Sequence, residues 1–73
     1  DKEEEYKRLL DEIKEILKES KEVLKDSKRV LEDIKRKVPD DDLVKLLEKH
    51  VRLLEEHVKL LEQLIREAEK SSK

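Results

Sequence analysis

A seven-residue apolar repeat runs through nearly the whole chain, and it constrains the fold more than any other feature. Leucine, isoleucine and valine recur at spacings of three and four residues, and the only proline, Pro39, interrupts the pattern once. Such spacing places apolar side chains on one face of an α-helix. A heptad sustained over this length favours left-handed supercoiling of packed helices. We therefore expect an all-α protein, in which two long amphipathic helices form a coiled-coil-like bundle.

The sequence Val38-Pro39-Asp40 marks the expected turn. A residue that precedes proline disfavours the α conformation, so the first helix should end near Lys37. Asp40 offers a side-chain oxygen that can cap the second helix. We expect one helical hairpin spanning residues 1–73, with helices at about 2–37 and 41–71 and a loop at about 38–40. A loop this short makes the two helices antiparallel neighbours.

The apolar positions differ in number between the two helices. We label heptad positions a to g, with Ile13 and Leu43 at position a of their helices. Apolar side chains of the first helix occupy a, d and e, an arc of about 100°, and those of the second also occupy b, an arc of about 160°. A hairpin buries one seam per helix, so another chain must cover the rest. The residues expected at this oligomer interface are Leu43, Val44, Leu46, Leu47, Val51, Leu53, Leu54, Val58, Leu60, Leu61, Leu64 and Ile65.

The unequal arcs also indicate how copies of the chain assemble. In a four-helix dimer both helices have similar surroundings and need similar apolar arcs. In a two-ring, six-helix trimer the inner helix meets more neighbours than the outer helix, and so it needs the wider arc. We therefore favour a homotrimer with the second helix in the inner ring, and a homodimer is the second alternative. Pairing with a different hairpin is a further alternative.

Four polar residues interrupt the apolar repeat at position a. They are His50 and His57 in the second helix and Ser20 and Ser27 in the first. Folding the chain back about its turn brings Ser20 opposite His57 and Ser27 opposite His50. A buried imidazole needs partners for both nitrogens, and a serine hydroxyl can supply one. Because burial disfavours the charged imidazolium, we interpret the four residues as a pH-sensing network that dissociates the oligomer in acid. A static pair of core histidines is the alternative.

The charged residues balance one another. There are 19 basic and 21 acidic residues, for a net charge of −2, and no basic surface emerges to which nucleic acid could bind. Opposite charges recur four residues apart on the second helix, where they are spaced to form ion pairs within the helix. The clearest examples of this spacing are Glu48–Arg52, Glu55–Lys59 and Glu62–Arg66.

Catalytic, metal and membrane functions lack their usual signals. The chain has no cysteine and no glycine, so there is no phosphate-binding loop, and no nucleophile is matched with a base. We predict no enzyme activity and no cofactor. His50 and His57 lie about 10 Å apart along one helix, too far to share a metal ion. No apolar run is long enough to span a bilayer, no signal peptide is expected at residues 1–5, and no location is indicated.

The whole chain resembles de novo designed helical-hairpin oligomers with buried hydrogen-bond networks. The resemblance rests on the Pro39-Asp40-Asp41-Asp42 turn, on the blocks Leu-Leu-Glu-Lys-His-Val and Leu-Leu-Glu-Glu-His-Val, and on the serines that face them. The chain is most similar to the histidine-network members, which are designed trimers that dissociate in acid. The resemblance implies an inner second helix, an outer first helix, no enzyme activity and membrane contact only after acid dissociation. Asparagine and threonine, common in such networks, are missing here.

Overall fold

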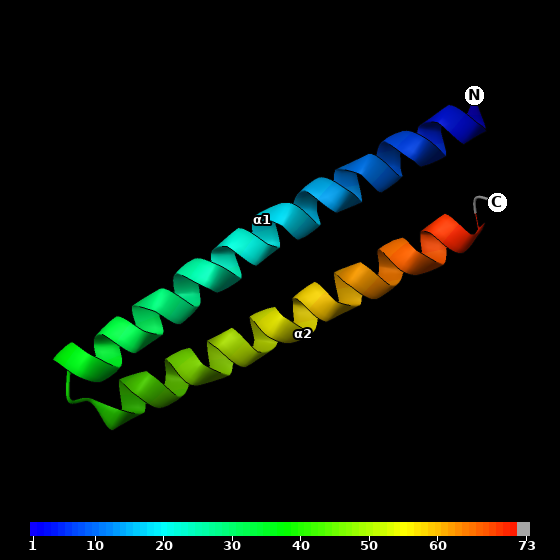
Figure 1. Ribbon diagram of the computed structural model, residues 1–73. Coiled ribbons are helices and arrows are strands. Elements are labelled where there is room, and N and C mark those ends of the chain that lie inside the picture. Colours follow the sequence, from blue (N-terminus) through cyan, green and yellow to red (C-terminus); the bar gives the residue numbers. More distant parts are fainter. Residues whose placement is uncertain (72–73) are drawn as a thin grey trace.

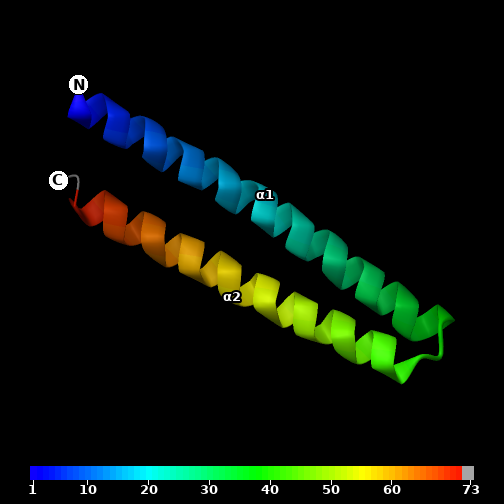
Figure 2. The same ribbon diagram turned by 180° about the vertical axis from the view of Figure 1, so that it is seen from behind.

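The computed structural model describes residues 1–71 as a hairpin of two α-helices. Helix α1 spans Lys2–Lys37 and helix α2 spans Asp41–Ser71. The helices run antiparallel and lie side by side, with the start of α1 and the end of α2 at one end of the hairpin and the turn at the other (Figures 1 and 2). The hairpin is 56 Å long. The helix bounds match those expected from the sequence.

Helix α1 begins and ends for local reasons. The side chain of Asp1 caps its start by accepting a hydrogen bond from the backbone N–H of Glu3 at 2.9 Å. Acidic residues in the first turn and basic residues in the last turn both interact favourably with the helix dipole and stabilise α1. Val38 then leaves the helix with φ −125° and ψ 108°, the extended conformation that a following proline favours.

Asp40 starts helix α2, as expected. Its Oδ1 accepts a hydrogen bond from the backbone N–H of Leu43 at 3.0 Å. Its backbone oxygen accepts from the N–H of Val44 at 3.1 Å. These two bonds satisfy N–H groups that the first turn of a helix leaves without an internal partner. The tight turn at Pro39 and this cap together set the antiparallel arrangement.

The seam between the helices is narrow. It joins positions a and e of α1 to positions b and e of α2. The best covered side chains are each 7% exposed, and they are Leu31, Val51, Val58 and Ile65. No side chain within residues 1–71 is completely buried. A core in a chain of this size rarely supplies more than about 3–5 kcal/mol, and this one is thin even by that measure.

Four ion pairs between the helices close one side of the seam. We call them the Lys–Glu ladder. Lysines at position b of α1 meet glutamates at position f of α2, with N–O distances of 3.7–4.0 Å, in the pairs Lys14–Glu69, Lys21–Glu62, Lys28–Glu55 and Lys35–Glu48.

The ladder replaces ion pairs that the sequence predicted within α2. The expected pairs Glu48–Arg52, Glu55–Lys59 and Glu62–Arg66 do not form within residues 1–71. That prediction is wrong because α1 brings a lysine within reach of each of these glutamates. Arg52, Lys59 and Arg66 are exposed and form no ion pair within residues 1–71.

Candidate functional site

The side of the hairpin opposite the Lys–Glu ladder is open and apolar. Position d of α1 and positions a and d of α2 form it, and we call it the apolar face. Its most exposed members are Leu46 at 67%, Leu60 at 64% and Leu53 at 56%. Its other large apolar side chains are 37–52% exposed, and they are Leu9, Ile16, Val23, Val30, Leu43 and Leu64. A continuous apolar surface of this length is typical of an association site.

Both histidines lie within the apolar face. His50 and His57 occupy position a of α2 between Leu43 and Leu64, and both are exposed in the hairpin. Ser27 Oγ lies 3.4 Å from His50 Nε2, which is a long hydrogen bond whose donor depends on the ring tautomer. The pairing of Ser27 with His50 that the sequence predicted is therefore present.

The second predicted pair is not joined in the same way. Ser20 is half-buried in α1, and His57 is exposed. No hydrogen bond connects the two within residues 1–71, whereas one connects Ser27 to His50. Each imidazole has two ring nitrogens, so each keeps at least one that no group of the described hairpin satisfies. Both rings are exposed in the hairpin, so their remaining nitrogens are accessible to solvent or to another chain.

The structure divides the residues that the sequence assigned to the oligomer interface. Those at positions a and d lie on the apolar face and are exposed, namely Leu43, Leu46, Leu53, Leu60 and Leu64. Those at positions b and e face α1 and are half-buried or buried, namely Val44, Leu47, Val51, Leu54, Val58, Leu61 and Ile65.

The position-b residues are the clearest difference from the expectation. Val51, Val58 and Ile65 were assigned to contacts between copies, whereas in the single hairpin each is 7% exposed because α1 packs against it. Sequence reasoning also missed position d of α1, which contributes Leu9, Ile16, Val23 and Val30 to the exposed surface. The equal spacing of position d in both helices is the signal that could have found them.

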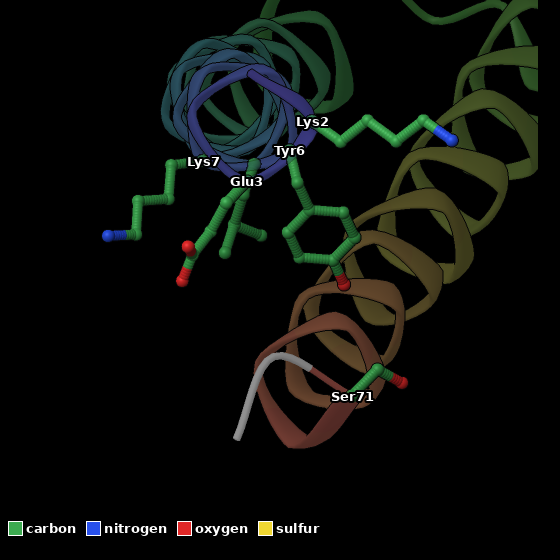
Figure 3. A pocket seen from close by; sticks show the side chains of 6 residues that line it. Lys2, Glu3, Tyr6, Lys7 and Ser71 are labelled. Atoms are coloured by element: carbon green, nitrogen blue, oxygen red, sulfur yellow. The ribbon is translucent and has the colours of Figure 1, made fainter.

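A shallow pocket lies between the helices at the open end of the hairpin. Tyr6 extends from α1 toward α2 (Figure 3), and its hydroxyl donates a hydrogen bond to the backbone oxygen of Ala68 at 2.7 Å. Ala68 takes a position e that leucine fills elsewhere in α2, which makes room for the ring. The lining, which includes Lys2, Lys7 and Ser71, brings together no nucleophile and base. Tyr6 therefore closes the end of the seam.

Within residues 1–71, no three His, Asp or Glu side chains are grouped so that they could hold a metal ion. No helix in that part of the chain is both long and apolar enough to cross a membrane. Comparison with known protein families, characterised proteins and solved structures gives no match. The function must therefore be argued from the apolar face and from the two histidines within it.

Proposed function

We propose that this chain is a designed, self-assembling hairpin whose copies cover one another's apolar faces and separate in acid. The observation that carries the proposal is the make-up of that face, in which His50 and His57 stand among rows of exposed leucine. A homotrimer with α2 in the inner ring is preferred to a homodimer, because α2 contributes two rows to the face and α1 only one. In this proposal the chain is not an enzyme and uses no cofactor.

Burial of the apolar face supplies the driving force. Complete burial of a leucine side chain is worth about 1.5–3 kcal/mol. Leu46, Leu53 and Leu60 are each more than half exposed in the hairpin, so most of that free energy is available only on association. A second copy has the same spacing of apolar side chains, and symmetric association of identical surfaces is the commonest way in which such faces are covered.

Acid acts on the same surface through the histidines. Covering the apolar face also buries His50 and His57, and burial disfavours the charged imidazolium. Separated chains therefore bind more protons than the assembly, and the stability of the assembly falls as the pH falls. The reference pKa of a histidine side chain in a model peptide is about 6.5, so assembly should be intact above that pH and should weaken below it. Ser27 holds one nitrogen of His50, which positions that ring within its layer.

The experiment is light scattering coupled to size-exclusion chromatography, from pH 8 to pH 5. We expect a mass of three chains at pH 8 and of one chain at pH 5, with most of the change between pH 6.5 and pH 5. The reference pKa values of aspartate and glutamate are near 4, so this pH range is chosen to separate a histidine response from a carboxylate response. A mass of three chains that persists at pH 5 would contradict the acid response. A monomer at pH 8 would contradict self-assembly and would favour a partner hairpin of different sequence.

The variant His50→Asn, His57→Asn isolates the contribution of the histidines. Asparagine offers a donor and an acceptor but gains no charge in acid, so the polar layers can persist without a switch. The smaller side chain leaves a void that should cost about 1–2 kcal/mol per site, which the intact leucine rows should tolerate. We expect this variant to remain assembled at pH 5. If it dissociates at the same pH as the parent chain, the histidines belong to a static bundle and the carboxylates control dissociation.

A further inference from the structure

Two rows of charged side chains on the hairpin each have a single sign. Position g of α1 is acidic in every heptad, and we call it the acidic row, Glu5, Glu12, Glu19, Asp26 and Asp33. Position c of α2 is basic from Lys45 onward, and we call it the basic row, Lys45, Arg52, Lys59 and Arg66. On α2 this row lies between position f, which forms the ladder, and position g. On α1, the acidic row lies next to position d, at the outer edge of the apolar face.

The basic row has no electrostatic partner in the hairpin. Within residues 1–71, none of its four members forms an ion pair, whereas the glutamates of the neighbouring position f are all engaged by α1. Three members of the acidic row form ion pairs on α1 itself, Glu5 with Arg8, Asp26 with Arg29 and Asp33 with Arg36. Asp26 meets Arg29 one turn along the same helix at 3.9 Å, with both side chains 66% exposed. Glu12 and Glu19 have no ion pair in the described residues. The four residues of the basic row, together with Glu12 and Glu19 of the acidic row, thus have no ion pair within residues 1–71.

We propose that the acidic row of one copy docks against the basic row of α2 in the next copy, so that the copies form a closed ring of three. This inference rests on the proposed function, because it specifies how the copies that cover the apolar face are placed. The occupant of the face is a second copy of this chain, with its own α1 lying in the groove between two α2 helices.

The Lys–Glu ladder provides the geometric precedent. Where α1 packs on its own α2, the outer edge of the contact is lined by lysines of α1 and glutamates of α2. Where α1 packs on the α2 of the next copy, the outer edge is lined by the acidic row of α1 and the basic row of α2. The second contact has the same heptad spacing and the opposite assignment of charge. A helix in the groove is therefore held on both sides by complementary charges.

The heights of the two rows also agree. Rotation about a ring axis keeps every residue at its height, so the register within one hairpin applies between copies. Ser27 lies opposite His50 in the hairpin. Asp26 of one copy therefore lies near the height of Arg52 in the next. Since each row has a single sign, a shift of one heptad still places an acid opposite a base.

The rows favour a ring of three over a dimer. In a ring of three, α2 is contacted on one side by the α1 of its own chain and on the opposite side by the α1 of the neighbouring chain. The basic row then lies at the outer edge of the contact with the neighbouring chain. In a four-helix dimer, the contacts of α2 with its own α1 and with the partner chain are at right angles. The outer edge of the contact with the partner chain then falls on position g of α2. That position has mixed charge, with Asp42, Lys49, Glu56 and Gln63. Only the ring of three places opposite signs together in every heptad.

Four full-length variants test this arrangement. The acidic-row variant carries Glu12→Lys, Glu19→Lys, Asp26→Lys and Asp33→Lys. The basic-row variant carries Lys45→Glu, Arg52→Glu, Lys59→Glu and Arg66→Glu. A double-row variant carries all eight changes. A control variant alters the charge by the same amount as the acidic-row variant, but on the outer side of α1, with Glu4→Lys, Asp11→Lys, Glu15→Lys and Glu22→Lys. Light scattering at pH 8 and low salt gives the mass, and circular dichroism gives the helix content.

We expect three chains for the parent, the control variant and the double-row variant, and one chain for each single-row variant at the same concentration. Salt at about 1 M should return part of the lost assembly, because it screens the repulsion between like rows. Single-row variants that keep the mass of the parent would overturn the inference, and so would a double-row variant that stays dissociated. If the parent assembles and the single-row variants have the same mass as the parent, only this inference is refuted. If the parent is a monomer, the proposed function is refuted as well.

Discussion

Replacing the three most exposed leucines with glutamine should abolish assembly while leaving the seam of the hairpin untouched. Leu46, Leu53 and Leu60 occupy position d of α2, on the side away from α1, and they are 56–67% exposed. The best covered residues of α2 at the seam, such as Val51 and Val58, lie on a different side of the helix. Glutamine forms helices well, so the substitutions remove apolar surface without adding a strong helix-breaking effect.

The magnitude follows from the exposure of these leucines. Complete burial is worth about 1.5–3 kcal/mol per leucine, so the exposed part accounts for roughly 1–2 kcal/mol each and roughly 3–6 kcal/mol per chain. Since about 1.4 kcal/mol corresponds to a tenfold change in an equilibrium constant, each chain should lose roughly two to four orders of magnitude in affinity for the assembly.

Sedimentation equilibrium over a wide range of chain concentrations at pH 8 measures this loss. The variant should remain a single chain at concentrations where the parent is assembled. A matched control changes Lys18, Lys25 and Glu32 to glutamine at position f of α1, on the outer side of the hairpin, and it should assemble as the parent does. If the leucine variant has the mass of the parent throughout, then position d of α2 is not the surface that other copies cover.

Three further predictions concern the seam, its open end and the released chain. Lys28→Ala removes the Lys28–Glu55 ion pair of the Lys–Glu ladder. Because both side chains are partly exposed, the free energy of unfolding in urea should fall by only about 0.2–1 kcal/mol, and by less at high salt. A loss that salt leaves unchanged would contradict an electrostatic role. Tyr6→Phe removes the hydrogen bond to the backbone oxygen of Ala68 and should lower the free energy of unfolding by about 0.5–1.5 kcal/mol, with an unchanged unfolding midpoint as the contrary result. Chains released in acid expose the leucine rows beside cationic histidines, so dye leakage from anionic liposomes should be greater at pH 5 than at pH 7.5; equal leakage at both would separate membrane contact from disassembly.

The features that could be predicted from the sequence are those with local causes. The end of α1 follows from the conformational restriction that Pro39 places on Val38, and the start of α2 follows from the capping side chain of Asp40. Opposition of Ser27 and His50 follows almost as directly, because a tight turn leaves little freedom in how far one helix slides along the other. Each of these inferences involves a turn or a single pair of positions.

The rotation of α2 about its own axis could not be predicted in the same way. Its apolar arc of about 160° is wide enough for two separate seams, and nothing in a single arc tells which seam α1 occupies. The structure gives positions b and e to α1, so Val51 is buried and Leu53 is exposed. The charged residues could have identified the seam that α1 occupies. The lysines of α1 at position b can pair with the glutamates of α2 at position f only when α1 packs over Val51.

In the proposed function, sensitivity to acid belongs to the assembly, because His50 and His57 are exposed in the single hairpin. Protons and chain concentration then act on one equilibrium in opposite directions. Three chains carry six histidines in total, two from each. If all six take up a proton on dissociation into three chains, each tenfold rise in concentration should lower the midpoint of dissociation by about 0.3 pH unit. Light scattering at several concentrations measures this shift. A midpoint that does not depend on concentration would mean that the histidines titrate inside a single hairpin, and the link between assembly and acid would fail.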